Sequence, residues 1–277
     1  DHRDLHSFPT RRSSDLNLSV GAKQEELEYV YEKGLKAVPT FGVIPCTATF
    51  GTEPYSEQPL MPTKKIEGLR SDGTLHMDHK LVIHKPISKE GKLHLEKVIS
   101  AVYDRGEGKG AKINVDIIAK DEAGDPVFTN TMGYLNRWAG GFGGPKVPHS
   151  TVVIPEREAD YEIKDAYPEN APLLYRLTGD TYPLHADPAF AKKAGFDRPI
   201  VHGLCSLGYA CRMMIDALFP GEPERMVSIE NQFRAVALPG DHFTLHVWKT
   251  GENEALFRMV KDSDGKAILD YGRMTWK

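Results

Sequence analysis

The chain has 277 residues, of which 40% are hydrophobic and 27% are charged, and its formal net charge is −4. This length and composition are enough for two fused hydrophobic cores, and a sequence pI near 6.3 argues against a nucleic-acid-binding protein. The sequence has no apolar run near the roughly eighteen residues of a membrane-spanning helix, so we expect no membrane association.

Residues 1–16 do not match the rest of the chain. They show no apolar period and mix charges of both signs. The segment resembles a translated sequencing adapter at the end of a gene model, so we predict a non-native or disordered tail and expect the natural N-terminus to be missing. A helix is expected directly afterwards, because apolar residues recur at helical spacing around Leu27, Val30, Tyr31 and Leu35.

The middle of the chain has patterns typical of β-strands. His76, His79 and His84 lie in one such segment; without a nearby cysteine or an H-E-x-x-H helix, we predict a strand with exposed histidines and no metal site. Further strands are expected at 93–103, 111–120 and 127–135. Asp104 and Arg105 are predicted to form a solvated hairpin turn.

Residues 139–145 form a glycine cluster, AGGFGGP. The cluster lacks the Lys-Ser/Thr of a phosphate-binding loop and the strand-to-helix setting of a dinucleotide-binding motif. We therefore expect no nucleotide chemistry and predict instead a tight crossing near the interface between two halves of the chain.

The most informative segment runs from residue 175 to 203, YRLTGDTYPLHADPAFAKKAGFDRPIVHG. Gly179 gives access to positive φ and Pro183 removes a donor, so the part around Asp180 should be a fixed loop. His185 follows Asp180 by five residues, which lets a carboxylate and an imidazole approach one water molecule as a general acid/base pair. Taken alone, an aspartate and a histidine at this spacing are more often a turn residue and a packed core histidine.

Two helices are predicted around this loop. Asp187 is a suitable N-cap before Pro188, and a two-turn helix is expected as far as residue 194. From Gly203 the apolar spacing predicts a long, mostly buried helix that ends before Pro220. Its first turn would present free N–H groups to a negatively charged oxygen, and close packing is the alternative explanation for Gly203.

After this helix the sequence repeats the strand pattern of its first half. Strands are expected from Pro239, at 254–260, and after the turn at 262–265 up to Trp276. The two halves, residues 17–150 and 151–277, therefore form a diverged internal repeat, and the second copy carries the acid/base segment.

The segment resembles the signature of the MaoC-like, (R)-specific enoyl-CoA hydratases, Y-x-L-S/T-G-D-x-N-P-L-H-x-D-P followed by A-G-F-x-x-P-I-x-H-G-L. The matching residues are Tyr175, Leu177, Thr178, Gly179, Asp180, Pro183, Leu184, His185, Asp187, Pro188, Ala194, Gly195, Phe196, Pro199, Ile200, His202, Gly203 and Leu204. The resemblance implies an α+β double hot-dog fold, in which each of two fused repeats is a long helix wrapped by a curved antiparallel sheet.

The same resemblance implies that the two repeats have different roles. The repeat at 17–150 would form an acyl tunnel without catalytic residues, and the repeat at 151–277 would hydrate trans-2-enoyl-CoA to (3R)-3-hydroxyacyl-CoA. The catalytic pair would be Asp180 and His185, with the Gly203 N–H as oxyanion donor. Substrate-binding positions would be Tyr182, Pro183, His202 and Phe142.

One position departs from the signature, because Tyr182 replaces the family's asparagine. This keeps open the alternative of a non-catalytic acyl-CoA-binding or partner subunit. A hot-dog thioesterase is a second alternative, independent of this position. For the hydratase, acyl-CoA is the substrate and no metal or redox cofactor is expected. A homodimer is expected too. The cysteines Cys46, Cys205 and Cys211 form no C-x-x-C, and the sequence ends without S-K-L, so we predict a cytoplasmic enzyme.

Overall fold

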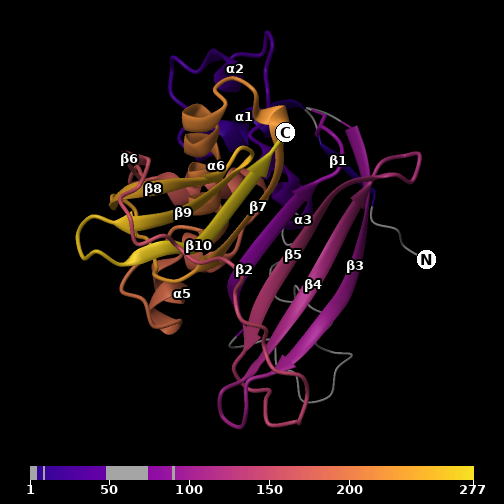
Figure 1. The fold of residues 1–277 in the computed structure, drawn as a ribbon, viewed down its shortest axis with the longest axis vertical. Coiled ribbons are helices and arrows are strands. Elements are labelled where there is room, and N and C mark those ends of the chain that lie inside the picture. Colours follow the sequence, from indigo (N-terminus) through magenta and orange to yellow (C-terminus); the bar gives the residue numbers. More distant parts are fainter. Residues whose placement is uncertain (1–4, 9, 48–73, 89–90) are drawn as a thin grey trace.

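The protein is described by a computed structural model that covers residues 5–8, 10–47, 74–88 and 91–277. Its strands form one antiparallel sheet in the order β1-β3-β4-β5-β2-β7-β10-β9-β8-β6 (Figure 1). Their bounds are β1 Leu5–Phe8, β2 Thr74–Ile83, β3 Gly91–Asp104, β4 Ala111–Lys120, β5 Pro126–Asn136, β6 Tyr161–Ala166, β7 Met226–Phe233, β8 His242–Gly251, β9 Glu254–Lys261 and β10 Ala267–Trp276.

The sheet consists of two halves with the same topology. Strands β1 to β5 are ordered 1-3-4-5-2, and strands β6 to β10 are ordered 6-8-9-10-7. The halves join where β2 pairs with β7, with Leu81 opposite Ile229. The repeated strand pattern of the sequence is therefore a structural repeat, and the fold is the α+β double hot-dog.

The helices of the described residues are α1 Thr10–Ser19, α2 Leu27–Val30, η1 Pro39–Val43, α3 Ile44–Thr47, α4 Ala171–Tyr175, η4 Arg176–Thr178, η5 Pro183–His185, α5 Pro188–Lys193, α6 Gly203–Leu218 and η6 Pro223–Arg225. Helix α6 packs against β7, β8 and β10, and η1 packs against β2 and β5. The predicted long helix is α6, and its side chains Leu207 and Ile215 are fully buried. In the first half, η1 and α3 lie against the sheet, and residues 48–73 fall outside the described part.

Helix α6 is tied to the N-terminal segment by a buried arginine. Arg212 Nε donates to the carbonyl of Val20 at 3.1 Å, and its guanidinium contacts Glu26 at 2.9 Å, Asp165 at 3.2 Å and Asp216 at 3.3 Å. Burial and the neighbouring Glu26 raise the pKa of Asp216 to about 7. This cluster links residues 20–26 to both α6 and β6.

The N-terminal region differs from two expectations. The predicted boundary at residue 16 falls inside α1, where Leu16 is buried. The helix expected around Leu27 and Leu35 lasts only from Leu27 to Val30, because the backbone becomes extended at Tyr31 and the side chain of Leu27 is 59% exposed. Tyr29 is buried and Leu27 is not, so the apolar spacing did not predict which residue of this helix faces the core. The division into residues 1–16, 17–150 and 151–277 stays a prediction.

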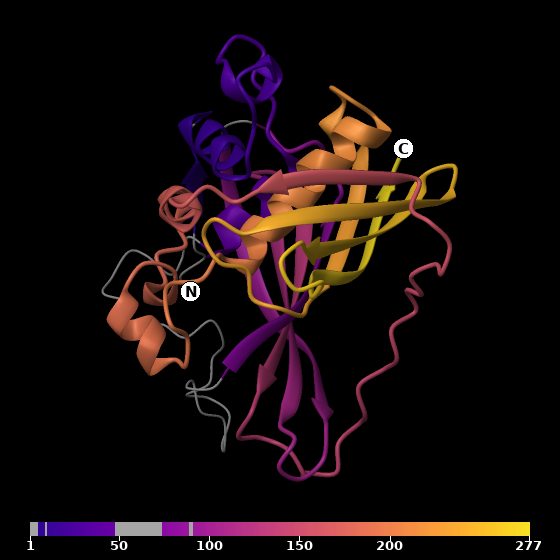
Figure 2. The same ribbon diagram turned by 90° about the vertical axis from the view of Figure 1, so that its left-hand side faces the viewer.

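A long extended connection runs along the outside of the molecule between β5 and β6 (Figure 2). Its glycine cluster surrounds the carboxylate of Asp104, which accepts from the N–H groups of Gly106 at 2.8 Å, Gly141 at 2.8 Å and Gly143 at 2.7 Å. Asp104 is therefore a buried anchor and not the solvated turn residue that we expected. These hydrogen bonds hold the pKa of Asp104 below its usual value. Among the described residues, no helix is long and apolar enough to cross a membrane.

Candidate active site

The loop that carries Asp180 is fixed by local hydrogen bonds. Gly179 adopts φ +131°, which lets the chain turn sharply after η4. The Thr178 hydroxyl donates to the carbonyl of Tyr175 at 2.7 Å, and the Arg176 guanidinium donates to the carbonyl of Thr181 at 3.2 Å. The predicted N-cap at Asp187 is confirmed, since its carboxylate accepts from the N–H of Ala189 at 2.8 Å. The loop is thus a rigid support for its polar side chains.

The ring of His185 has a defined tautomer. Its Nδ1 lies 2.9 Å from the carbonyl oxygen of Ile200. A carbonyl only accepts, so Nδ1 carries the hydrogen and Nε2 keeps its lone pair. Burial lowers the pKa of His185, although the charge of Asp180 opposes this shift. The imidazole is therefore neutral and available as a base near neutral pH.

Asp180 is the acidic partner of this ring. Burial raises the pKa of its carboxyl, while His185 and the N–H of Tyr182, 3.3 Å from Oδ1, favour the charged form. The two shifts, up for the acid and down for the base, bring the proton affinities of the pair closer together. Matched affinities are what reversible proton transfer requires.

His202 lies underneath this pair and does not reach outward from it. Its ring stacks on His185 with centroids 3.6 Å apart, and Nε2 lies 3.2 Å from the backbone carbonyl of Asp180. Only 1% of the residue is exposed. His202, predicted as a substrate contact, is thus placed as a support that holds both catalytic candidates.

Tyr182 and Pro183 stand next to the pair. The ring of Tyr182 packs edge-to-face between His185, at 6.0 Å, and Phe190 of α5, at 5.4 Å. Pro183 begins η5, the short turn that ends at His185. The tyrosine at the family's asparagine position therefore packs towards α5.

Gly203 starts α6 within the same site. It is exposed although His202 and Leu204 on either side are buried. A Cβ added to Gly203 would lie 2.9 Å from the ring of Phe233, so the position has room for a glycine only. Phe142, in contrast, is 52% exposed in the glycine cluster that Asp104 anchors, and no described contact brings it to Asp180.

The first half contributes residues that the sequence motif did not indicate. Burial, and after it the charge of Asp180, raises the pKa of Tyr134 on β5, so this tyrosine lies within electrostatic range of Asp180. Its ring stacks on His76 of β2 at 5.0 Å. The histidines at 76, 79 and 84 were expected to be exposed, but His79 is 1% exposed and His76 is half-buried. His84, directly after β2, is exposed, with Nε2 2.9 Å from the Thr129 hydroxyl.

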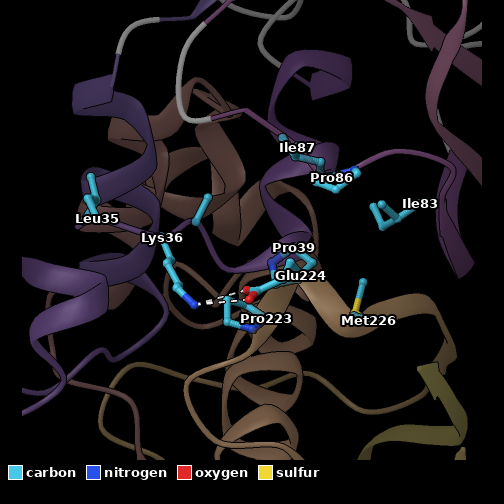
Figure 3. A pocket seen from close by; sticks show the side chains of 10 residues that line it. Leu35, Lys36, Pro39, Ile83, Pro86, Ile87, Pro223, Glu224 and Met226 are labelled. Carbon is cyan, nitrogen blue, oxygen red and sulfur yellow. Dashed lines mark hydrogen bonds and ion pairs between the residues drawn. The ribbon is translucent and has the colours of Figure 1, made fainter. Parts of the chain in front are cut away.

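Two pockets lie away from this site. One pocket, of about 190 Å³, lies at the last residue of β2 and the first residue of β7, and it is lined by Ile83, Met226 and Ile87. Lys36 forms an ion pair with Glu224 across this pocket, at 3.3 Å (Figure 3). Another, of about 310 Å³, is lined by strands of both halves and by residues 147–152 of the connection. Neither includes Asp180 or His185.

The fold and the site define a double hot-dog protein with a candidate acid/base pair in its second half. Residues 150–269 match the model of the MaoC like domain, and residues 6–137 match that of the MFE-2 hydratase 2 N-terminal domain. A solved structure, a MaoC-like dehydratase from Phytophthora capsici, superposes with a TM-score of 0.88 at 26% identity, covering 99% of this chain and 93% of that one.

Two curated relatives extend this similarity. The "Probable enoyl-CoA hydratase 2" of Dictyostelium discoideum is 33% identical over 92% of this chain and 86% of its own length. "Enoyl-CoA hydratase ChsH3" of Mycobacterium tuberculosis is 31% identical over 92% of this chain and 87% of its own length. The chain belongs to the MaoC-like, type-two enoyl-CoA hydratase family.

Proposed function

We propose that this protein reversibly hydrates trans-2-enoyl-CoA thioesters to (3R)-3-hydroxyacyl-CoA. The observation that carries the proposal is the His185 tautomer: the hydrogen bond from Nδ1 to Ile200 leaves Nε2 as a free base beside the carboxyl of Asp180. A water molecule that donates to Nε2 and to the carboxylate would be held for attack on one face of the alkene.

The reaction then needs one proton to move. As the water oxygen bonds to C3, Nε2 of His185 takes the proton, and the electrons of the C2=C3 bond shift onto the thioester oxygen. The N–H of Gly203, at the positive end of α6, stabilises this enolate-like oxygen. The Asp180–His185 pair returns a proton to C2, which restores the carbonyl. Atoms and charge balance without a metal or a redox cofactor, because the unsaturated thioester is already electrophilic.

Two assays run side by side test this proposal. Loss of the ultraviolet absorbance of the conjugated enoyl-thioester without release of free thiol supports hydration. Release of thiol would identify a thioesterase instead. Tight binding of acyl-CoA with neither signal would identify a non-catalytic binding subunit, the alternative that Tyr182 raises.

The proposal also includes a homodimer in the cytoplasm. Cys46, Cys205 and Cys211 are buried free thiols, which suits a reducing compartment. A plant relative is named "Enoyl-CoA hydratase 2, peroxisomal". Light scattering on the purified protein tests the dimer, and fractionation of the source cells tests the location.

A further inference from the structure

A cluster of polar side chains is buried where the two halves of the sheet join. His79 on β2 is paired directly with Asn231 on β7, and both side chains are almost fully buried, at 1% and 3% exposure. His76 lies with its ring 5.4 Å from that of His79, and Asn130 of β5 contacts His79 at 2.9 Å. We call His76, His79, Asn130 and Asn231 the seam cluster.

Several polar atoms of the seam cluster have no hydrogen-bond partner in the described part of the chain. They are Nε2 of His76, Nδ1 of His79, and both Nδ2 and Oδ1 of Asn231. Buried polar groups in native proteins are nearly always paired, because an unpaired one loses its hydrogen bonds to water without replacement. Several such atoms in one place indicate that a polar partner occupies this site in the working protein.

The hydrogen bonds that are present fix what this partner must be. Asn130 Nδ2 donates to the carbonyl of Gly42 at 3.0 Å, so its Oδ1 accepts from Nε2 of His79. The free Nδ1 of His79 is therefore an acceptor. His76 makes a hydrogen bond to the backbone of Asp78 that raises its pKa, as expected for a ring N–H donating to a carbonyl, so Nε2 is an acceptor too.

Burial keeps both rings neutral, because it lowers the pKa of His79 to about 4 and that of His76 well below its usual value. The open positions are thus two ring acceptors beside one amide that offers a donor and an acceptor. A hydroxyl group can pair part of this set, since its hydrogen is donated to one ring nitrogen while its oxygen accepts from Asn231 Nδ2. A ketone has no hydrogen to donate and would pair neither ring, and a charged group would meet no opposite charge.

The seam cluster is connected to the proposed reaction centre through Phe233. The ring of His76 lies 4.9 Å from that of Phe233, which packs on Gly203, and it also stacks on Tyr134, whose pKa is raised by burial and by the charge of Asp180. An acyl chain whose C2 and C3 lie at the acid/base pair and whose thioester oxygen lies at Gly203 would have these two rings beside it. Beyond them it would meet the seam cluster.

We propose that the seam cluster is a subsite for a hydroxyl group carried on the acyl chain, so that the enzyme selects hydroxylated enoyl-CoA substrates. This rests on the proposed hydration of enoyl-CoA. Water offers the same hydroxyl chemistry, and a bound water alone is the competing occupant that the experiment must separate. A site built to hydrogen-bond a hydroxyl discriminates strongly against the analogue that lacks it.

The test compares trans-2-enoyl-CoA esters of equal length that carry no substituent, a hydroxyl, or a ketone at successive carbons beyond C4. For the parental protein we expect kcat/KM to be at least about tenfold higher for the hydroxylated ester at one chain position, the size of one neutral hydrogen bond. Asn231→Leu, similar in volume, should abolish or reverse that preference. Asn114→Leu is the matched control, because Asn114 also has an unpaired buried Oδ1 but lies on β4, outside the seam cluster, and should keep the preference.

Crotonyl-CoA, with no carbon beyond C4, is measured with each variant. A variant that keeps crotonyl-CoA hydration has folded and retains its chemistry, so a lost preference is then specific to the subsite. If Asn231→Leu does not fold, the hydroxyl scan on the parental protein still decides. Equal kcat/KM for hydroxylated and plain chains at every position overturns the proposal and leaves a bound water as the occupant. Failure of the parental protein to hydrate crotonyl-CoA or any longer ester instead overturns the proposed function.

Discussion

The buried imidazole of His79 should make the stability of this protein depend on pH. Its folded-state pKa is about 4, against 6.5 for an exposed histidine. As the pH falls below 6.5, the unfolded chain binds this proton before the folded protein does. The stability contribution is therefore fully present above pH 6.5 and is lost as the pH falls towards 4.

The size of this effect follows from the linkage relation. Between the two pKa values the difference is one proton, so the free energy of unfolding falls by about 1.4 kcal/mol per pH unit, or about 2 kcal/mol between pH 8 and pH 5. We expect His79→Leu to remove this part of the dependence. The variant also leaves Asn130 Oδ1 without its donor. This loss lowers the free energy of unfolding by about 1–3 kcal/mol equally at every pH, so it does not itself alter how the free energy of unfolding varies with pH.

The assay is urea unfolding of the parental protein and His79→Leu at intervals from pH 8 to pH 5. Both proteins carry the same carboxyls and the same other histidines, so the difference between their pH slopes reports on His79 and on its effect on the neighbouring His76, whose pKa His79 helps to lower. His84→Leu, which removes an exposed imidazole at the end of the same segment, is the matched control and should keep the parental slope. Parallel curves for the parental protein and His79→Leu would show that His79 is protonated equally in both states, and the reasoning from burial would be wrong.

Three further predictions concern the proposed active site. Asp180→Asn and His185→Ala should each lower kcat about a hundredfold or more, and the double variant should lose little beyond either one, since the two act as a unit; near-parental kcat in either single variant would refute the assignment. Tyr182→Asn should raise kcat/KM severalfold, roughly 1 kcal/mol, and Tyr182→Phe should leave it unchanged if the ring only packs, whereas a tenfold loss would show that the hydroxyl positions the water. Gly203→Ala places a methyl group 2.9 Å from a phenylalanine ring and should lower kcat/KM about tenfold with little change in KM. The control Gly251→Ala, where the added methyl group makes only ordinary contacts, should match the parental enzyme. Equal losses in both variants would argue against a role of Gly203 in the transition state.

Elements that depend on neighbouring residues were predictable from the sequence. Asp187 and Pro188 set the start of α5 through a cap and a fixed φ, and α6 begins at Gly203 and ends at Leu218 as its apolar spacing predicted. The proximity of Asp180 and His185 also depends on neighbouring residues, because a short loop fixed by Gly179 connects them. The proposed chemistry of the second half therefore rests on this one segment.

Burial across the junction of the two halves could not be predicted in this way. The side chains on β2 alternate, so the sequence alone does not say which face is covered, and His79 became a core residue only because β2 pairs with β7. The same holds for Tyr134, a buried residue of the other half whose pKa is raised by burial and by the charge of Asp180. Asp104, which looked like a turn residue, is buried by a glycine cluster nearly forty residues later in the chain.

The sequence by itself thus determined the family, through its motif, and the repeat, through its pattern of strands and turns. The acid/base pair of Asp180 and His185 stays a prediction from the same motif. The tertiary structure alone decided the tautomer and the pKa shifts of that pair, and it alone brought the seam cluster together. Tautomers and pKa shifts are set by what surrounds a side chain in space, and for His185 and His79 those partners come from other segments of the chain.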